Sequence, residues 1–228
     1  LRLVSLGARV VADGRDRDVS IYLADPDSGT VVVLEKTLAF KDGEEPPAAP
    51  ALLARRVASG VSLGALANGQ VVTRVARRIA NRRLVLGEAR GGRTSVTPQT
   101  GEWQAFPEPL RVKSLSRLAE AWRSRPPRLL RPRVLAADVH VIEIEEVVSI
   151  AYEPGRQRLV AEVSTPEGEA LRVVREHRSA APAALDALAS VLSGGEGKVR
   201  FLSGPLQRRG GSFECDPLAV SADRLVVI

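Results

Sequence analysis

Residues 19–37 have the sequence VSIYLADPDSGTVVVLEKT, and residues 159–177 have the sequence LVAEVSTPEGEALRVVREH. In each stretch, two runs rich in β-branched residues flank a turn that contains Pro and Gly. Pro presets φ for the second position of a turn, and Gly adopts the positive φ that such turns need. The two stretches align without a gap, with Pro26 on Pro166. The sequence therefore predicts the same β-hairpin in each half of the chain.

Further short β-rich runs and one helix candidate accompany each hairpin, bounded by Pro- and Gly-containing turns. In the first half, a Pro-rich hinge at 44–50 precedes the helix candidate, and Gly60 ends it. The elements predicted for the first half are strands at 8–12, 19–24 and 30–36, a helix at 51–58, and strands at 70–75 and 83–86. Those predicted for the second half are strands at 139–151, 158–163 and 171–175, a helix from an N-cap at Ser179 to Ser193, strands at 198–202 and 212–215, and a last run at 224–228.

The two halves share more than the hairpin. In order along the chain, residues 48–53 match 180–185, residues 69–71 match 197–199, and Arg82-Arg83 matches Arg208-Arg209. Ordered matches of this kind indicate an internal duplication. The alternative is that an alanine-rich composition produces such matches by chance.

Each half therefore has the order β-β-β-α-β-β, and the fold class is mainly β with one helix per half. This order resembles the OB-fold, a five-stranded Greek-key barrel with a helix between its third and fourth strands, over about three quarters of the chain. The run at 197–204, followed by a basic turn and the strand at 212–215, is similar to the last two strands of such barrels. The resemblance implies tandem OB-fold-like small barrels. SH3-like barrels and small α+β sheets are the alternatives.

The predicted domains are a first OB-like barrel at 1–96, a Pro- and Arg-rich helical connector at 97–137, and a second OB-like barrel at 138–228. The connector contains a helix candidate at 114–124, in which Leu115, Leu118 and Trp122 share one face. We expect this helix to pack against the barrels and its Pro-rich ends to hold the halves in a fixed relation.

Composition is that of a folded globular protein, with 228 residues, 44% hydrophobic and 26% charged. No apolar run is long enough to span a bilayer as a helix, and the single cysteine agrees with a reducing compartment, so we expect a cytoplasmic protein without a membrane partner. The arginine-rich, lysine-poor composition suggests a bacterial source. The chain begins at Leu1 and contains no methionine, which indicates a processed, trimmed or partial chain. Its oligomeric state is not predicted.

The search for catalytic and metal-binding motifs favours a protein that is not an enzyme. A zinc site is excluded because His140, His177 and Cys215 supply three N or S ligands where four are needed. The G-x-S-x-G pattern around Ser62 follows a helix, whereas a nucleophilic serine elbow follows a strand. No motif supports a nucleophile pair of Cys215 and His177. The glycine-rich run at 194–198 fails the phosphate-loop pattern. Asp25 and Asp27 do not begin a calcium loop, because Lys36 stands where its bidentate glutamate would be. We predict no cofactor and no catalytic residue.

Arginine is the remaining signal, and it makes the chain basic, with a net charge of +6 and a pI near 10.2. Guanidinium groups pair with phosphates in bidentate fashion and stack on bases. We therefore predict a non-catalytic nucleic-acid-binding accessory protein that prefers single strands and uses an arginine-rich surface. The predicted nucleic-acid-binding residues are Arg74, Arg77, Arg78, Arg82, Arg83, Arg208 and Arg209. A further arginine group lies in the connector, at Arg117, Arg123, Arg125, Arg128, Arg131 and Arg133.

The sequence offers few residues for base stacking, and it allows an alternative function. Aromatic residues, on which single-stranded bases stack, are scarce, and only Tyr22, Tyr152 and Phe201 fall on predicted strands. We expect Phe201 to lie in the core. The alternative function is a protein-interaction subunit of a larger bacterial complex, whose arginines form a solvated face balanced by Glu143, Glu145 and Glu146.

Overall fold

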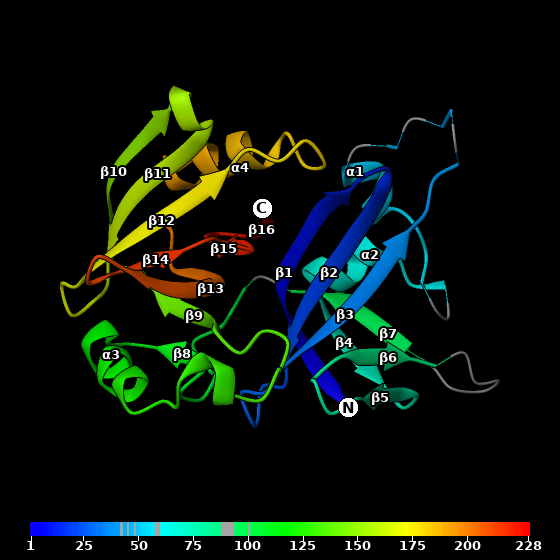
Figure 1. The fold of residues 1–228 in the computed structure, drawn as a ribbon, viewed down its shortest axis with the longest axis horizontal. Helices are drawn as coiled ribbons and strands as arrows, with labels where there is room; N and C mark the ends of the chain where they lie inside the picture. The colour runs from blue at the N-terminus through cyan, green and yellow to red at the C-terminus, as the bar shows by residue number, and fades with distance from the viewer. Residues whose placement is uncertain (42, 45, 48, 58–59, 88–93, 100) are drawn as a thin grey trace.

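The computed structural model describes residues 1–41, 43–44, 46–47, 49–57, 60–87, 94–99 and 101–228. Over these residues the protein is mainly β with few, short helices, as the sequence predicts (Figure 1). The strands form a five-stranded sheet, a nine-stranded sheet and a two-stranded hairpin. Glu45 and Ala48 of the predicted hinge, and Ala58 of the predicted first helix, lie outside the described residues.

The first half contains strands and two short helices in the following order: β1 (Arg2–Asp13), β2 (Asp16–Ala24), β3 (Val31–Leu38), α1 (Ala49–Leu53), α2 (Leu63–Asn68), β4 (Gly69–Thr73), β5 (Ala76–Arg78), β6 (Leu84–Leu86) and β7 (Thr94–Pro98). The connector contributes β8 (Arg111–Val112), α3 (Leu115–Arg123) and the 3-10 helix η2 (Arg128–Leu130). The second half contains β9 (Val139–Glu143), β10 (Glu146–Glu153), the 3-10 helix η3 (Pro154–Arg156), β11 (Arg158–Ser164), β12 (Ala170–Glu176), α4 (Ala184–Leu192), β13 (Phe201–Arg209), β14 (Ser212–Cys215), β15 (Ala219–Ser221) and β16 (Leu225–Val227).

The first sheet has the order β3-β2-β1-β4-β7, and every neighbouring pair is antiparallel. The strand predicted at 83–86 belongs to the β5–β6 hairpin, and the fifth strand is β7. This hairpin contacts the edge of β3, where the Val33 amide donates to the Arg82 carbonyl at 3.0 Å. Because the hairpin occupies that edge, no ladder joins β3 to β7 in the described part of the chain. The first sheet is therefore open, and the prediction of a barrel for the first half is wrong.

The second sheet follows the path β10-β11-β12-β14-β13-β9, with β8, β15 and β16 added along β9 and β13. β12 and β14 are parallel, pairing Arg172 with Glu214, and α4 lies between β12 and β13 in the chain. β9 and β10 are consecutive strands at the two ends of this path. Among the described residues no ladder joins them, so the hydrogen-bonded path does not close into a complete barrel.

The five strands of the first sheet pair in the order third, second, first, fourth, fifth. The second half has the same order if β9 and β10 are counted together as its first strand. The predicted hairpins are confirmed as β2–β3 and β11–β12. This shared order does not by itself establish a duplication, which stays a prediction.

The helices differ in detail from the prediction. α3 is confirmed, with Ser114 as its N-cap. In the first half, the helix expected at 51–58 is replaced by α1 and α2, because the chain turns back between them to bury both Leu52 and Leu66. α4 begins after Ala183 rather than after Ser179, because Ala180 extends across to the core of the first half.

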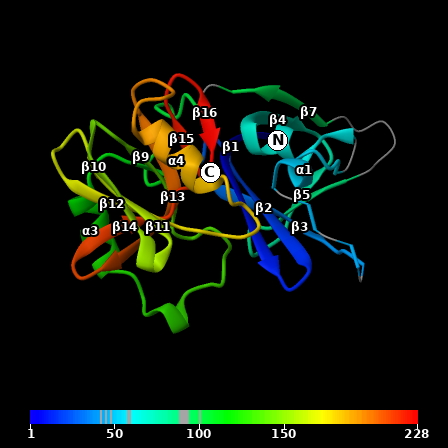
Figure 2. The same ribbon diagram turned by 90° about the horizontal axis from the view of Figure 1, so that it is seen from above.

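Three buried clusters hold these elements together. One lies within each half, and α3 and α4 pack on the cluster of the second half through Leu115, Leu118 and Leu188. The third cluster lies between the halves and includes the fully buried Trp103 of the connector. It unites side chains of β1, β9 and β13, so the two halves share a core. In the ribbon, β1 lies at the side of the first half that faces β13 (Figures 1 and 2). The fixed relation expected between them follows from this packing.

Candidate nucleic-acid interface

The first predicted arginine group lies on and beside the β5–β6 hairpin. Arg77 and Arg78 are exposed on β5, and Arg74 is exposed just before it. Arg82 and Arg83 form the turn of the hairpin, where Arg83 pairs with Glu35 of β3 at 3.6 Å. The hairpin therefore brings these five arginines onto one small projection of the first half.

The second predicted group, Arg208 and Arg209, lies at the end of β13, next to the two-residue turn that leads into β14. The Arg208 guanidinium lies 5.8 Å from the centre of the Phe213 ring. Arg209 pairs with Glu214 at 3.4 Å. Both views place β14 and the β5–β6 hairpin on opposite sides of the molecule (Figures 1 and 2). The structure does not bring the two predicted groups together.

A polar face crosses β11, β12, β14 and β13 of the second half. Arg158 donates to Glu153 at 2.8 Å, Arg172 bonds to Glu214 at 3.2 Å, and Gln207 bonds to Glu214 at 3.5 Å. The Arg158 hydrogen bond holds the pKa of Glu153 below its ordinary value. We call this set of side chains the OB face; its members are Glu153, Arg158, Arg172, Gln207, Arg209 and Glu214. Arg158 and Glu214 are buried within it.

The OB face borders a cavity of about 150 Å³. The cavity is lined by the charged side chains of Arg158, Glu176, Arg178, Arg209, Glu214 and Asp216, together with Val174, Gln207 and Cys215. Cations and carboxylates are equal in number here, so the cavity is polar rather than strongly basic. No aromatic side chain lines it among the described residues.

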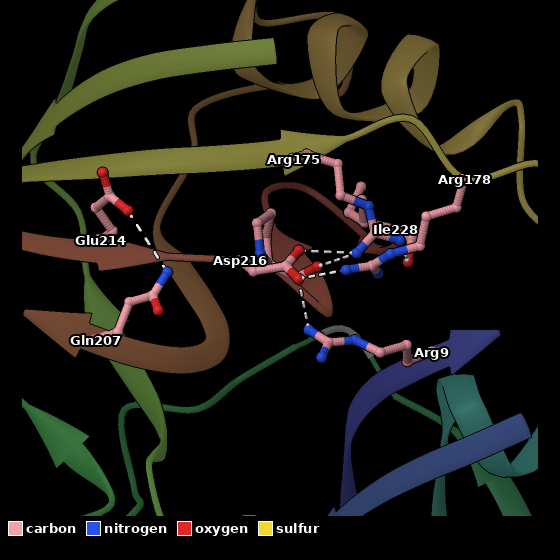
Figure 3. Close-up of polar contacts among 8 residues, drawn as sticks. Arg9, Arg175, Arg178, Gln207, Glu214, Asp216 and Ile228 are labelled. Atoms are coloured by element: carbon pink, nitrogen blue, oxygen red, sulfur yellow. Dashed lines mark hydrogen bonds and ion pairs between the residues drawn. The ribbon is translucent and has the colours of Figure 1, made fainter. Parts of the chain in front are cut away.

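One carboxylate at the edge of this cavity binds three arginines. Asp216 accepts hydrogen bonds from Arg9 at 2.8 Å, from Arg175 at 2.9 Å and from Arg178 at 2.6 Å (Figure 3). Arg175 also donates to the Ile228 carbonyl at 3.2 Å. Burial acts to raise the pKa of Asp216, but the three guanidinium groups outweigh it and hold that pKa below its ordinary value. The cluster thus keeps Asp216 charged and leaves a local excess of positive charge.

Sequence reasoning did not identify Arg158, Arg172, Arg175, Arg178 or Asp216. The available signal was the pair of arginines inside the β-branched run of β12, since charged residues in such a run must find partners or solvent. Of the aromatic residues on predicted strands, Phe201 is buried, as expected. Tyr152 is half exposed, but it pairs with the buried Leu159 and so points to the other side of the sheet from Arg158.

The structure places three residues that were considered for catalysis or metal binding. Ser62 caps α2, and its hydroxyl accepts a hydrogen bond from the Ala65 amide at 3.1 Å. Cys215 is fully buried, and burial raises the pKa of its thiol far above the ordinary value. The His140 ring contacts the Pro109 carbonyl at 2.9 Å, and burial lowers its pKa. In the part of the chain that the structure describes, no three His, Cys, Asp or Glu side chains are grouped to hold a metal ion.

The strand order, the parallel pairing of β12 with β14 and the position of α4 define the second half as an OB-fold domain. Residues 136–228 match the family model of the YehQ C-terminal OB-fold domain. The chain is also 33% identical over 220 residues to Protein YehQ of Escherichia coli (strain K12). That alignment covers 95% of this chain and 35% of YehQ, so the chain spans about a third of the length of this relative.

Among solved structures, the chain is similar to the HINa domain of Ifi202, crystallised in complex with 20bp dsDNA. The TM-score is 0.38 and the sequence identity 9%, with 100% of this chain and 94% of the other covered. A TM-score this low does not establish a shared fold. Among the described residues, no helix is both long enough and apolar enough to cross a membrane.

Proposed function

We propose that the second half binds nucleic acid, preferably single-stranded, through the OB face and the adjoining β13–β14 turn, without catalysis. One observation carries the proposal. Arg208 and Arg209 lie beside the loop that joins the fourth and fifth strands of an OB-fold domain. In OB-folds this loop, the loop after the first strand and the face of strands two and three bind oligonucleotides.

The side chains of the OB face suit contacts to the phosphate backbone. Guanidinium groups bind phosphate oxygens in bidentate fashion, and Arg158, Arg172 and Arg209 are held in place by Glu153 and Glu214. A phosphate that binds here must compete with these carboxylates, so we expect moderate affinity. Since no aromatic side chain lines the cavity among the described residues, we expect little discrimination between bases.

A salt-dependent binding measurement tests the proposal. Fluorescence anisotropy with a labelled oligothymidylate at low salt should show binding that weakens steeply as salt is added, since each neutralised phosphate releases counterions. R208A/R209A should weaken binding and reduce the log–log salt slope by about 0.7 for each phosphate that the protein no longer neutralises. R77A/R78A is the matched control, because it also removes two exposed arginines, on the opposite side of the molecule.

The outcomes separate the two arginine groups. A larger loss of affinity for R208A/R209A than for R77A/R78A supports binding by the OB-fold domain. A larger loss for R77A/R78A transfers the site to the β5–β6 hairpin. If the unaltered protein binds neither DNA nor RNA oligomers at low salt, the proposal is rejected.

A second candidate function is docking to another protein, and the connector supports it. Leu129 is 97% exposed and Leu130 is 75% exposed in η2, between the Pro-rich end of α3 and Arg131. Two adjacent leucines with most of their surface exposed are unfavourable unless a partner covers them. A photo-crosslinking residue at 129 should capture one defined protein in cells, whereas the same residue at the exposed Ser124 should not. Equal labelling patterns at the two positions would reject the docking function.

A further inference from the structure

A second cavity, of about 150 Å³, lies between β8 and α3. Its lining includes three cationic side chains, Arg111, Lys113 and Arg117, and an apolar wall to which Pro109 and Leu118 contribute. It has no lining residue in common with the cavity at the OB face. The β8–α3 pocket, formed by the connector, is therefore separate from the cavity at the OB face.

In the part of the chain that the structure describes, the cations of this pocket have no anionic partner. Among the described residues, Arg111, Lys113 and Arg117 form no ion pair and no side-chain hydrogen bond, although Glu108 also lines the pocket. This contrasts with the OB face, where Arg158, Arg172 and Arg209 all pair with carboxylates. Three cations against one carboxylate leave the pocket with an excess of positive charge.

Arg111 has a buried donor without a partner, a feature that the Nε atoms of Arg9, Arg17 and Arg175 share. Its Nε atom is shielded from solvent and has no hydrogen-bond partner. Buried polar atoms in native proteins are nearly always hydrogen-bonded, and an orphaned donor costs free energy. β8 fixes the Arg111 backbone by parallel pairing with Val141 of β9, so the side chain emerges beside the pocket from a rigid strand.

The N-terminus of α3, by contrast, already has its anion. Glu169 accepts hydrogen bonds from the backbone amides of Leu115 at 2.5 Å and Ser116 at 2.8 Å. These contacts satisfy the helix end and anchor α3 against the β11–β12 loop. A ligand anion in the β8–α3 pocket must therefore be held by the side chains of Arg111, Lys113 and Arg117.

We propose that the β8–α3 pocket binds a phosphate group, with Arg111, Lys113 and Arg117 as its ligands. Two guanidinium groups and one ammonium group supply several donors to the phosphate oxygens. The apolar wall accommodates the non-phosphate part of a phosphorylated ligand. The phosphate is either free or part of a nucleic-acid backbone, and the chemistry of recognition is the same for both.

Titration calorimetry with inorganic phosphate and with oligothymidylate tests this site. The test variant is K113A/R117A, because both side chains are exposed and their loss should leave the fold intact. The control is R123A, which removes an exposed cation from the last turn of the same helix but outside the pocket. We expect K113A/R117A to weaken phosphate binding at least about tenfold and R123A to leave it unchanged.

The two ligands distinguish the sources of the phosphate. Binding of inorganic phosphate that K113A/R117A abolishes supports a site for a free or terminal phosphate group. If only oligothymidylate binding falls in K113A/R117A, the phosphate belongs to a nucleic-acid backbone. Loss of neither, or an equal loss in R123A, overturns the proposal. Because the OB face is tested by R208A/R209A, failure at one site is distinguishable from failure at the other.

Discussion

Arg9 of β1 donates a hydrogen bond to Asp216, which follows β14, at 2.8 Å, so an ion pair joins the two halves of the chain. The Arg9 side chain is 21% exposed and that of Asp216 is 23% exposed. Arg175 and Arg178 bind the same carboxylate from the second half (Figure 3). Asp216 therefore neutralises part of the repulsion among three guanidinium groups brought together from both halves.

D216N should destabilise the protein by about 2 kcal/mol, because it leaves three close arginines without their shared anion. This is below the roughly 3–5 kcal/mol of a fully buried pair, since Asp216 is partly solvated. D138N is the control, because Asp138 forms a single, more exposed ion pair with Arg125 and should change the free energy of unfolding by less than about 1 kcal/mol. Urea denaturation measures both values. Equal effects of the two variants would show that the cluster at Asp216 has no special role.

The same cluster makes stability depend on pH at the acidic end. Because the folded-state pKa of Asp216 is depressed, its stabilisation is present above the unfolded pKa, near 3.8, and is lost as the pH falls through the folded pKa. We expect the free energy of unfolding of the unaltered protein to fall as the pH decreases from about 5 to 3. D216N should show a shallower decrease over that interval. Identical slopes in urea denaturation would contradict this assignment.

Much of the fold was predictable because its signals are local. Pro26 and Pro166 mark two hairpins by turn chemistry, and the shared face of Leu115, Leu118 and Trp122 marks α3. The prediction placed the strand at 83–86 fifth in the first half, whereas it is β6 of a separate hairpin. A run of three apolar residues at Leu84–Leu86 does not reveal which neighbour it pairs with. Only long-range pairing distinguishes β6 from β7.

Part of the candidate site was also predictable, because its sequence signals are local. Arg208 and Arg209 were found because they are adjacent and lie beside a turn. The Asp216 cluster was missed because its Arg9 partner is 207 residues away in the chain. The pocket cations Arg111 and Arg117 come from two elements whose packing depends on Leu115 and Leu118, and no spacing rule in the sequence predicts a cavity between them.

Cys215 should be unreactive in the native protein. Its thiol is fully buried, burial raises its pKa, and the thiolate is the form that reacts with disulfide reagents. Labelling by dithionitrobenzoate should be at least about 100-fold slower in native buffer than in denaturant, since it requires opening of β14. Adding Cys at the exposed Ser124 provides a positive control for rapid labelling. Fast reaction of the single native thiol would contradict the burial of β14.

Gly7 is required where the two halves meet. It lies in the bulge of β1 with φ of 108°, and a Cβ atom there would come within 2.5 Å of the Leu218 carbonyl oxygen. G7A should therefore lower the free energy of unfolding by roughly 2–4 kcal/mol, because the backbone at residue 7 and the Leu218 backbone must move apart. Gly14, in the β1–β2 turn, has φ of 55°, but a Cβ atom added there would meet no other atom within 4 Å, so G14A should cost only about 1 kcal/mol from backbone strain. Denaturant midpoints that are the same for the two variants would show that β1 and the Leu218 segment do not pack as closely as the structure indicates.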